Sequence, residues 1–222
     1  MIDWAWVADH LDELLFRTVQ HLVFAAIAVG IGFAIAFVLA IWSVRRRSVY
    51  GPIIALTGVA YTIPSLAMIA LLVPITGISI VTAEVPLILY TLLIFVRNMV
   101  AGFDTVPSDV LEAADGMGFP RNKRLRRIEL PLAIPLIVVG VRLATVSTIG
   151  LVTITGILGD RFGGLGFFIF EGYRHSFPTE ILMGAVPSII LAVGADLILV
   201  RFERRLTPWF APARDGARPA TA

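Results

Sequence analysis

The chain has 222 residues, of which 58% are hydrophobic and 15% are charged, and its formal net charge is +2. A soluble domain is about half apolar and a quarter charged, so this composition indicates a membrane protein. The chain has no Cys, which excludes disulfides and thiolate metal sites. Its three His are not spaced like metal ligands, so no metal site is expected. The small net charge gives no reason to expect nucleic-acid binding.

The first twenty residues combine acidic and large apolar side chains. Trp4, Trp6, Leu15 and Phe16 are among the apolar ones. We expect residues 1–20 to form an external amphipathic segment that lies on the membrane surface. A loosely ordered polar lead-in is the alternative.

Five apolar runs follow, each near the roughly 20 residues that a helix needs to cross the hydrocarbon core. They cover about 21–44, 52–73, 85–102, 132–154 and 181–200. The predicted fold class is therefore all-α, a polytopic membrane protein with about five transmembrane helices in a domain over residues 21–205.

Basic residues gather in three clusters: Arg45–Arg47, Arg121–Arg127 and Arg201–Arg205. With five spans, all three clusters lie on one side of the membrane, which the positive-inside rule makes the cytoplasm. The N-terminus is then outside and the C-terminus in the cytoplasm. Residues 206–222, rich in Pro and Ala, are expected to form a disordered cytoplasmic tail.

A polar stretch at residues 107–131 separates the third and fourth spans. Ser108 or Asp109 is the predicted N-cap of a short helix, which Gly116 and Gly118 end. A second short helix is predicted from about Pro120. We expect a helical hairpin that projects into the cytosol, where the apolar side of its first helix needs a partner.

The hairpin contains Glu112-Ala113-Ala114, then Gly118, then Ile128-Glu129-Leu130-Pro131. This spacing resembles the EAA motif of ABC importer permeases, EAA-x3-G-x9-I-x-L-P, at every fixed position. The resemblance implies a coupling hairpin that docks into a groove on an ATP-binding subunit. The residues implied to shape the docking helix are Glu112, Ala113, Ala114 and Gly118, and those implied to anchor it to the fourth span are Ile128, Leu130 and Pro131.

Three further segments are similar to osmoprotectant importer permeases, which carry glycine betaine, choline or carnitine. They are Tyr61–Ala67, the span with Leu89-Tyr90 and Arg97-Asn98, and Gly163–Gly166. Asp160-Arg161-Phe162 departs from the usual pattern of one small residue before these glycines. This departure lies in an external loop, where a binding protein would dock.

The resemblance implies a permease subunit with the type I ABC importer fold, without catalytic residues or a cofactor of its own. The chain has no G-x-x-x-x-G-K-[ST] phosphate loop, so ATP and Mg belong to partner subunits. The implied partners are ATP-binding subunits, a second permease chain, identical or homologous, an external substrate-binding protein and the lipid bilayer of a prokaryotic plasma membrane.

The second span is interrupted by Gly58, Pro64 and Pro74. Backbone groups freed at membrane depth are tolerated where they are buried in protein or line a wet cavity. We expect the translocation path near this span, and the candidate residues are Tyr61, Thr62, Pro64, Ser65 and Asn98. The face of an aromatic ring at Tyr61 suits a quaternary ammonium group. A kinked helix packed through small residues is an equally good interpretation.

Arg97, Arg142 and Asp196 are ionisable residues within or at the ends of spans. A charge at the bilayer centre costs about 2.5–3.5 kcal/mol, so these side chains should face protein or water. We expect an intramembrane pair of Arg142 with Asp196, or of Arg97 with Asp196. Snorkelling to the cytoplasmic interface is the alternative for Arg97 and Asp196.

Other transporter classes fit less well. The coupling motif is shared among importers, so an amino-acid or methionine-type substrate stays open. A secondary transporter usually shows paired broken helices in two repeated halves, and this chain is too short for that unless it dimerises. A membrane enzyme needs a cluster of His, Asp or Glu at one membrane face, and the sequence gives none.

Overall fold

The computed structural model describes residues 2–207, and every regular element in that range is helical. In chain order the elements are α1 (Trp4–Asp9), α2 (Leu11–Arg45), α3 (Arg47–Thr62), α4 (Ser65–Thr76), α5 (Ile80–Asp104), α6 (Ser108–Gly116), α7 (Arg121–Arg124), the π-helical turn η1 (Leu125–Glu129), α8 (Leu130–Val152), the 3-10 turn η2 (Thr153–Leu158), α9 (Gly166–Arg174) and α10 (Pro178–Leu206).

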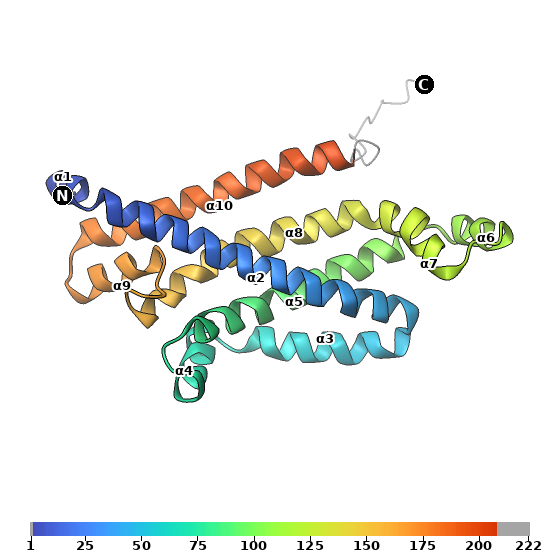
Figure 1. Ribbon diagram of the computed structural model, residues 1–222, viewed down its shortest axis with the longest axis horizontal. Helices are drawn as coiled ribbons and strands as arrows, with labels where there is room; N and C mark the ends of the chain where they lie inside the picture. The colour runs from blue at the N-terminus through green and yellow to red at the C-terminus, as the bar shows by residue number, and fades with distance from the viewer. Residues whose placement is uncertain (1, 208–222) are drawn as a thin grey trace, which may run out of the picture.

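The long helices α2, α5, α8 and α10 run along the length of the molecule, and α3 lies beside α2 and α5 (Figure 1). Short helices occupy the two ends. Helices α6 and α7 lie at one end, and α1 and α9 lie at the other. The α2–α3 turn and the end of α10, which carry the other basic clusters, point toward the α6 end, as expected for a five-span topology.

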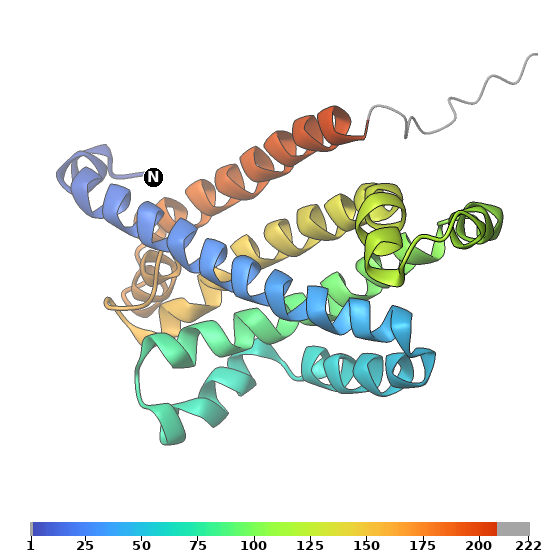
Figure 2. The same ribbon diagram turned by 45° about the vertical axis from the view of Figure 1, so that its right-hand side comes forward.

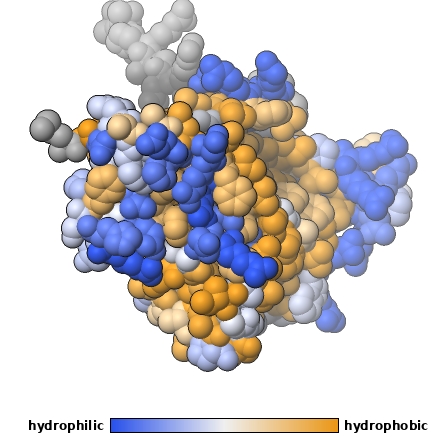
Figure 3. Space-filling view, turned by 60° about the vertical axis from the view of Figure 1, so that its left-hand side comes forward, coloured by the Kyte–Doolittle hydropathy of each residue, from blue (hydrophilic) through white to orange (hydrophobic). Residues whose placement is uncertain are grey.

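Four helices are long and apolar enough to cross a membrane: α2, α5, the continuous helix Arg121–Leu158 and α10. Helices α3 and α4 meet this criterion as a pair, which is bent by 91°. With that pair counted as one span, the described residues contain the five predicted spans. The flanks of the molecule are broadly hydrophobic and its α1–α9 end gathers hydrophilic residues (Figure 3), as a membrane protein requires.

The second span, 52–73, is interrupted as predicted, and the interruption lies at Pro64. Helix α3 ends at Thr62 and α4 begins at Ser65. Pro64 has no N–H to donate and disfavours helical geometry in the residue before it, and Ile63 is accordingly extended, with ψ at 126°. Gly58 and Pro74, also expected to interrupt this span, lie inside α3 and α4.

Helix α5 forms the centre of the packing between α2 and α8. Its side chains Phe95, Val96 and Met99 are fully buried. Small residues on its neighbours allow close approach: a Cβ added to Gly140 of α8 would lie 2.7 Å from the Cβ of Asn98, and one added to Gly32 of α2 would meet the hydroxyl of Thr91 at 1.9 Å. A larger residue at Gly140 would require one of the two helices to shift, and one at Gly32 would require the Thr91 side chain to move.

The two predicted ends of the transmembrane domain differ from the structure. Helix α2 runs unbroken from Leu11 to Arg45, so residues 11–20 belong to the first long helix, and the predicted boundary at residue 20 is not a structural one. At the other end, Leu206 still belongs to α10. The rest of the predicted tail, residues 208–222, lies outside the described residues.

Candidate functional site

Helix α6, which carries the predicted docking residues, projects from the end of the molecule (Figure 2). Pro107 precedes it and no side chain caps it, so the predicted cap at Ser108 or Asp109 is wrong. The Asp109 carboxylate instead accepts from the N–H of Val110, at 3.0 Å. The predicted stop is confirmed, because α6 ends at Gly116 and Gly118 takes a φ of +75°, which glycine adopts without a steric penalty.

The motif divides α6 into an outer and an inner side. Glu112 and Ala113 are exposed, whereas Ala114 is fully buried. Met117, at the end of the helix, is 67% exposed. The carboxylate of Glu112, the small side chain of Ala113 and the thioether of Met117 therefore form a surface that a partner can contact, while Ala114 packs against the chain itself.

The second arm of the hairpin is not a separate short helix. Residues from Arg121 onward form one continuous helix through η1 into α8 and on to Leu158. Leu125 and Leu130 pack against the core cluster that α2, α5 and α8 share. Ile128 and Pro131 are half-buried. Because the helix is unbroken, a movement of the hairpin would also move the fourth span.

Arg124 holds the two arms of the hairpin together. Its Nε donates to Oε1 of Glu129 at 2.7 Å, and its Nη1 donates to Oδ1 of Asp115 at 2.6 Å. Glu129 is buried and Arg124 is 22% exposed, so water screens this pair less than a surface ion pair. Sequence reasoning missed this contact, because Arg124 was interpreted only as part of a basic cluster.

At the break between α3 and α4, a carbonyl that makes no helical hydrogen bond accepts one from a residue on another helix. The hydroxyl of Tyr90 on α5 donates to the carbonyl of Ile63, and the hydroxyl of Thr62 donates to the carbonyl of Val59 at 2.7 Å. The ring of Tyr61 meets that of Tyr90 edge-on, with centroids 5.7 Å apart, and remains 45% exposed. Thr62 and Pro64 are also exposed, and Ser65 is half-buried.

Asn98 is not part of this break. It lies eight residues beyond Tyr90 on α5, which is about 12 Å along a helix. Its amide donates to the carbonyl of Ile94 at 2.8 Å, and its Cβ faces Gly140 on α8. The structure therefore places Asn98 in helix packing and not beside Tyr61.

Arg142 on α8 and Asp196 on α10 form a two-pronged ion pair. Nη2 of Arg142 donates to Oδ2 of Asp196 at 3.1 Å, and its Nε donates to Oδ1. Glu203, two turns further along α10, lies 3.8 Å from Nη1 of the same guanidinium. The alternative pairing of Asp196 with Arg97 is wrong, since Arg97 forms no ion pair within residues 2–207.

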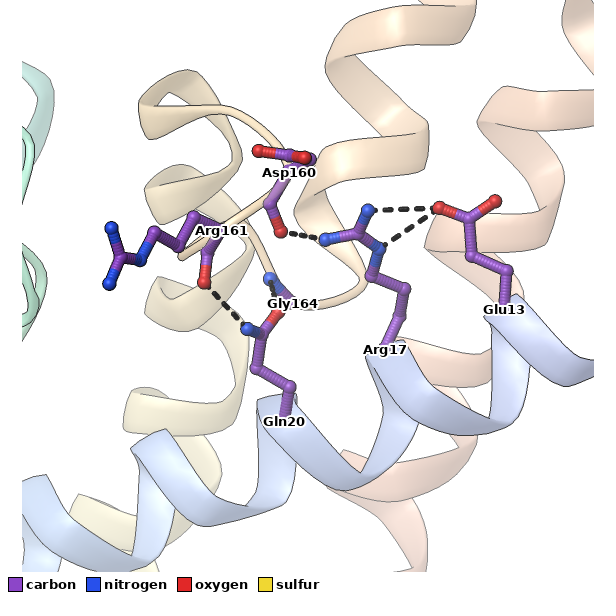
Figure 4. A network of polar contacts seen from close by, with 6 residues as sticks. All are labelled: Glu13, Arg17, Gln20, Asp160, Arg161 and Gly164. Carbon is purple, nitrogen blue, oxygen red and sulfur yellow. Dashed lines mark hydrogen bonds and ion pairs between the residues drawn. The ribbon is translucent and has the colours of Figure 1, made fainter.

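At the opposite end, the first turns of α2 hold the loop that contains the Asp160-Arg161-Phe162 departure (Figure 4). The guanidinium of Arg17 donates to the carbonyl of Asp160 and to Oε1 of Glu13, the latter at 2.9 Å. Gln20 donates to the carbonyl of Arg161 at 2.8 Å and accepts from the N–H of Gly164 at 2.9 Å. The loop is thereby fixed to α2 by its backbone.

Burial strengthens this contact. Arg17 is 5% exposed, and its guanidinium lies over the ring of Phe167 at 4.0 Å from the centroid, which is a cation–π geometry. Sequence reasoning placed Arg17 in a surface segment and missed its role in positioning the loop.

Long apolar helices, a bent helix pair and a projecting helical hairpin define a polytopic membrane protein. The family model described as "Binding-protein-dependent transport system inner membrane component" matches residues 28–208. The chain belongs to this family, the permease subunits of ABC importers.

Two relatives come from Bacillus subtilis (strain 168): the choline transport system permease protein OpuBB and the glycine betaine/carnitine/choline transport system permease protein OpuCB. Each is 38% identical over 196 residues, which is 88% of this chain and 89% of the relative. The osmoprotectant import permease protein OsmW of Salmonella typhimurium is 34% identical, over 91% of this chain and 96% of its own length.

Solved structures share the fold. A permease chain of the inward-facing MetNI methionine ABC transporter superposes with a TM-score of 0.76 at 20% identity, covering 87% of this chain and 96% of that one. A chain of an amino acid ABC transporter gives 0.70 at 16% identity, covering 92% and 99%. The predicted fold of a type I ABC importer permease is confirmed.

Replacing Arg124 by Gln should loosen α6. A hydrogen bond to a charged group is worth about 1.5–3 kcal/mol, so we expect about tenfold faster hydrogen exchange of the α6 amides in the R124Q variant, measured by mass spectrometry. Arg127→Gln, which removes an exposed charge three residues away, is the matched control. Unchanged exchange in R124Q would show that Arg124 does not position α6.

The Arg142–Asp196 pair is tested by a double-mutant cycle. Asp196→Ala leaves Arg142 with only the more distant Glu203, and Arg142→Ala leaves Asp196 unpaired, so the double variant should lose less stability than the sum of the two single variants. The measurement is the midpoint of thermal unfolding in detergent. Additive losses would argue against a coupled pair.

Proposed function

We propose that the chain is the permease subunit of an ATP-driven importer for compatible solutes such as glycine betaine, choline, carnitine or similar quaternary amines. The observation that carries this proposal is the identity of 34–38% with permeases named for these solutes, over 88% or more of the chain. The coupling hairpin and the exposed Tyr61 ring at the helix break support it.

The proposed assembly contains two permease chains, identical or homologous, two ATP-binding subunits and an external substrate-binding protein, in the plasma membrane of a prokaryote. ATP and Mg bind in the partner subunits, which supply the hydrolysis. The exposed Glu112 and Ala113 of α6 contact a groove on an ATP-binding subunit. Closure of these subunits moves α6, and the continuous helix Arg121–Leu158 carries the motion across the membrane.

The proposed translocation path runs beside the break between α3 and α4, at Tyr61, Thr62, Pro64 and Ser65. The exposed ring of Tyr61 offers a quaternary ammonium group a cation–π contact, and its edge-on contact with Tyr90 fixes the ring's orientation. Asn98 is left out of this proposal, because its side chain is engaged in packing against α8.

An amino-acid or methionine-type substrate is the alternative. The transporters of that kind with the same fold are 16–20% identical to this chain, which indicates shared architecture only. The relatives named for osmoprotectants are closer in sequence, and this favours compatible solutes.

Uptake distinguishes the two substrate classes. We expect the complex, expressed with its partner subunits in a host without compatible-solute importers, to restore growth at high salt when betaine, choline or carnitine is supplied, and to accumulate the radiolabelled solute. Methionine uptake by the same cells, without uptake of any quaternary amine, would overturn the proposed substrate class.

The coupling role is tested by Glu112→Lys, which reverses a charge on the exposed side of α6. We expect the variant to insert normally but to lose most of its uptake, about tenfold or more, because like or unpaired charges at a docking surface cost several kcal/mol. Asp12→Lys, an exposed charge reversal at the external end, is the control. Normal uptake by the Glu112 variant would contradict the docking role.

A further inference from the structure

A cavity of about 450 Å3 opens at the cytoplasmic end of α2, between its last turns and the helix that begins at α7. This volume lies in the range of ligand sites in proteins. The cavity lies apart from the exposed side of α6 and from the helix break, and it shares only Leu130 with the residues expected to couple the hairpin.

The floor of the cavity is apolar. It is formed by Phe37 and Ile41 of α2, Phe103 of α5, Leu125 of η1 and Leu130 of α8. Three of these helices belong to the membrane-spanning bundle, and the floor adjoins the hydrophobic core that they share. Such a surface suits an acyl chain.

The rim of the cavity is cationic. Arg45, Arg126 and Asn122 line it, and no carboxylate does. Arg45 donates to the amide oxygen of Asn122 at 2.7 Å, and both guanidinia are exposed. Neither arginine forms an ion pair with another residue in the described part of the chain.

Nearby carboxylates are already engaged. Glu129 lies in an adjoining cavity of about 320 Å3 and is bound by Arg124. Asp104, at the end of α5, is paired with Arg47. The two rim guanidinia are therefore left to bind an anion from outside the chain.

The cavity lies at the level of the cytoplasmic membrane interface. Trp42, next to Ile41 on α2, is 48% exposed, and exposed Trp side chains gather at the headgroup level of membranes. Helix α2 ends three residues later at Arg45. The rim thus lies at headgroup depth and the floor lies below it.

We propose that this cavity binds an anionic phospholipid of the cytoplasmic leaflet, with its phosphate between Arg45 and Arg126 and its acyl chains over the apolar floor. Basic pockets between transmembrane helices on the cytoplasmic side are suited to anionic headgroups. A soluble phosphate compound would use the rim but leave the half-buried floor residues in contact with water, which favours the lipid; these residues are Phe37, Ile41, Leu125 and Leu130.

The test uses the full complex in nanodiscs of phosphatidylcholine with a minority of phosphatidylglycerol. Native mass spectrometry counts the phosphatidylglycerol molecules that stay bound when the complex is released from the nanodisc. Arg126→Gln, which removes no contact within the described chain, should lower retention about fivefold, and the double change with Arg45→Gln should lower it further. Lys at both positions should preserve retention, and Arg204→Gln, an exposed change on α10, should have no effect.

Three results would overturn the proposal. One is equal phosphatidylglycerol retention by wild type and the Arg45 and Arg126 double variant. Another is displacement of the lipid by glycerol 3-phosphate as effectively as by short-chain phosphatidylglycerol, which would indicate a soluble phosphate ligand. The third is loss of the ATP-binding subunit from the double variant with lipid retention unchanged, which would assign the rim to a protein contact.

Discussion

The contact of Arg124 with Asp115 and Glu129 is the interaction on which the proposed coupling depends. Helix α6 projects from the bundle, and a short helix in water is marginally stable by itself. Arg124 joins α6 to the base of α8 through one guanidinium, with 2.6 Å and 2.7 Å hydrogen bonds on its two sides. Because Glu129 is buried, this contact also fixes α6 relative to the core and not merely to the surface.

The same helix reaches the opposite end of the molecule. The helix that contains Arg124 continues to Leu158, and the loop after it is held to α2 by Arg17 and Gln20. Nε2 of His21, which is fully buried, contacts the carbonyl of Ile149 at 2.9 Å, so α2 is also tied to α8 at that end. A movement of α6 would therefore be transmitted along this helix to the loop after Leu158, whose backbone is hydrogen-bonded to α2.

How much of this the sequence predicts depends on whether a feature is local. The hairpin and its turn at Gly118 follow from nearby residues, and the pairing of Arg142 with Asp196 followed from two charges at similar depth. The contacts of Arg124 and Arg17 depend on tertiary structure, which spacing alone does not show. Glu84 was placed outside the third span, but α5 begins at Ile80 and buries that carboxylate.

The break at Pro64 is a second case in which local sequence does not decide the structure alone. Gly58, Pro64 and Pro74 all weaken a helix in isolation, yet α3 and α4 accommodate Gly58 and Pro74. A break at membrane depth exposes a carbonyl, and its cost is removed only where another group donates to it. Tyr90 supplies that donor to Ile63, so α5 stabilises the break that the proline introduces, and the same Tyr90 ring packs edge-on against the exposed Tyr61.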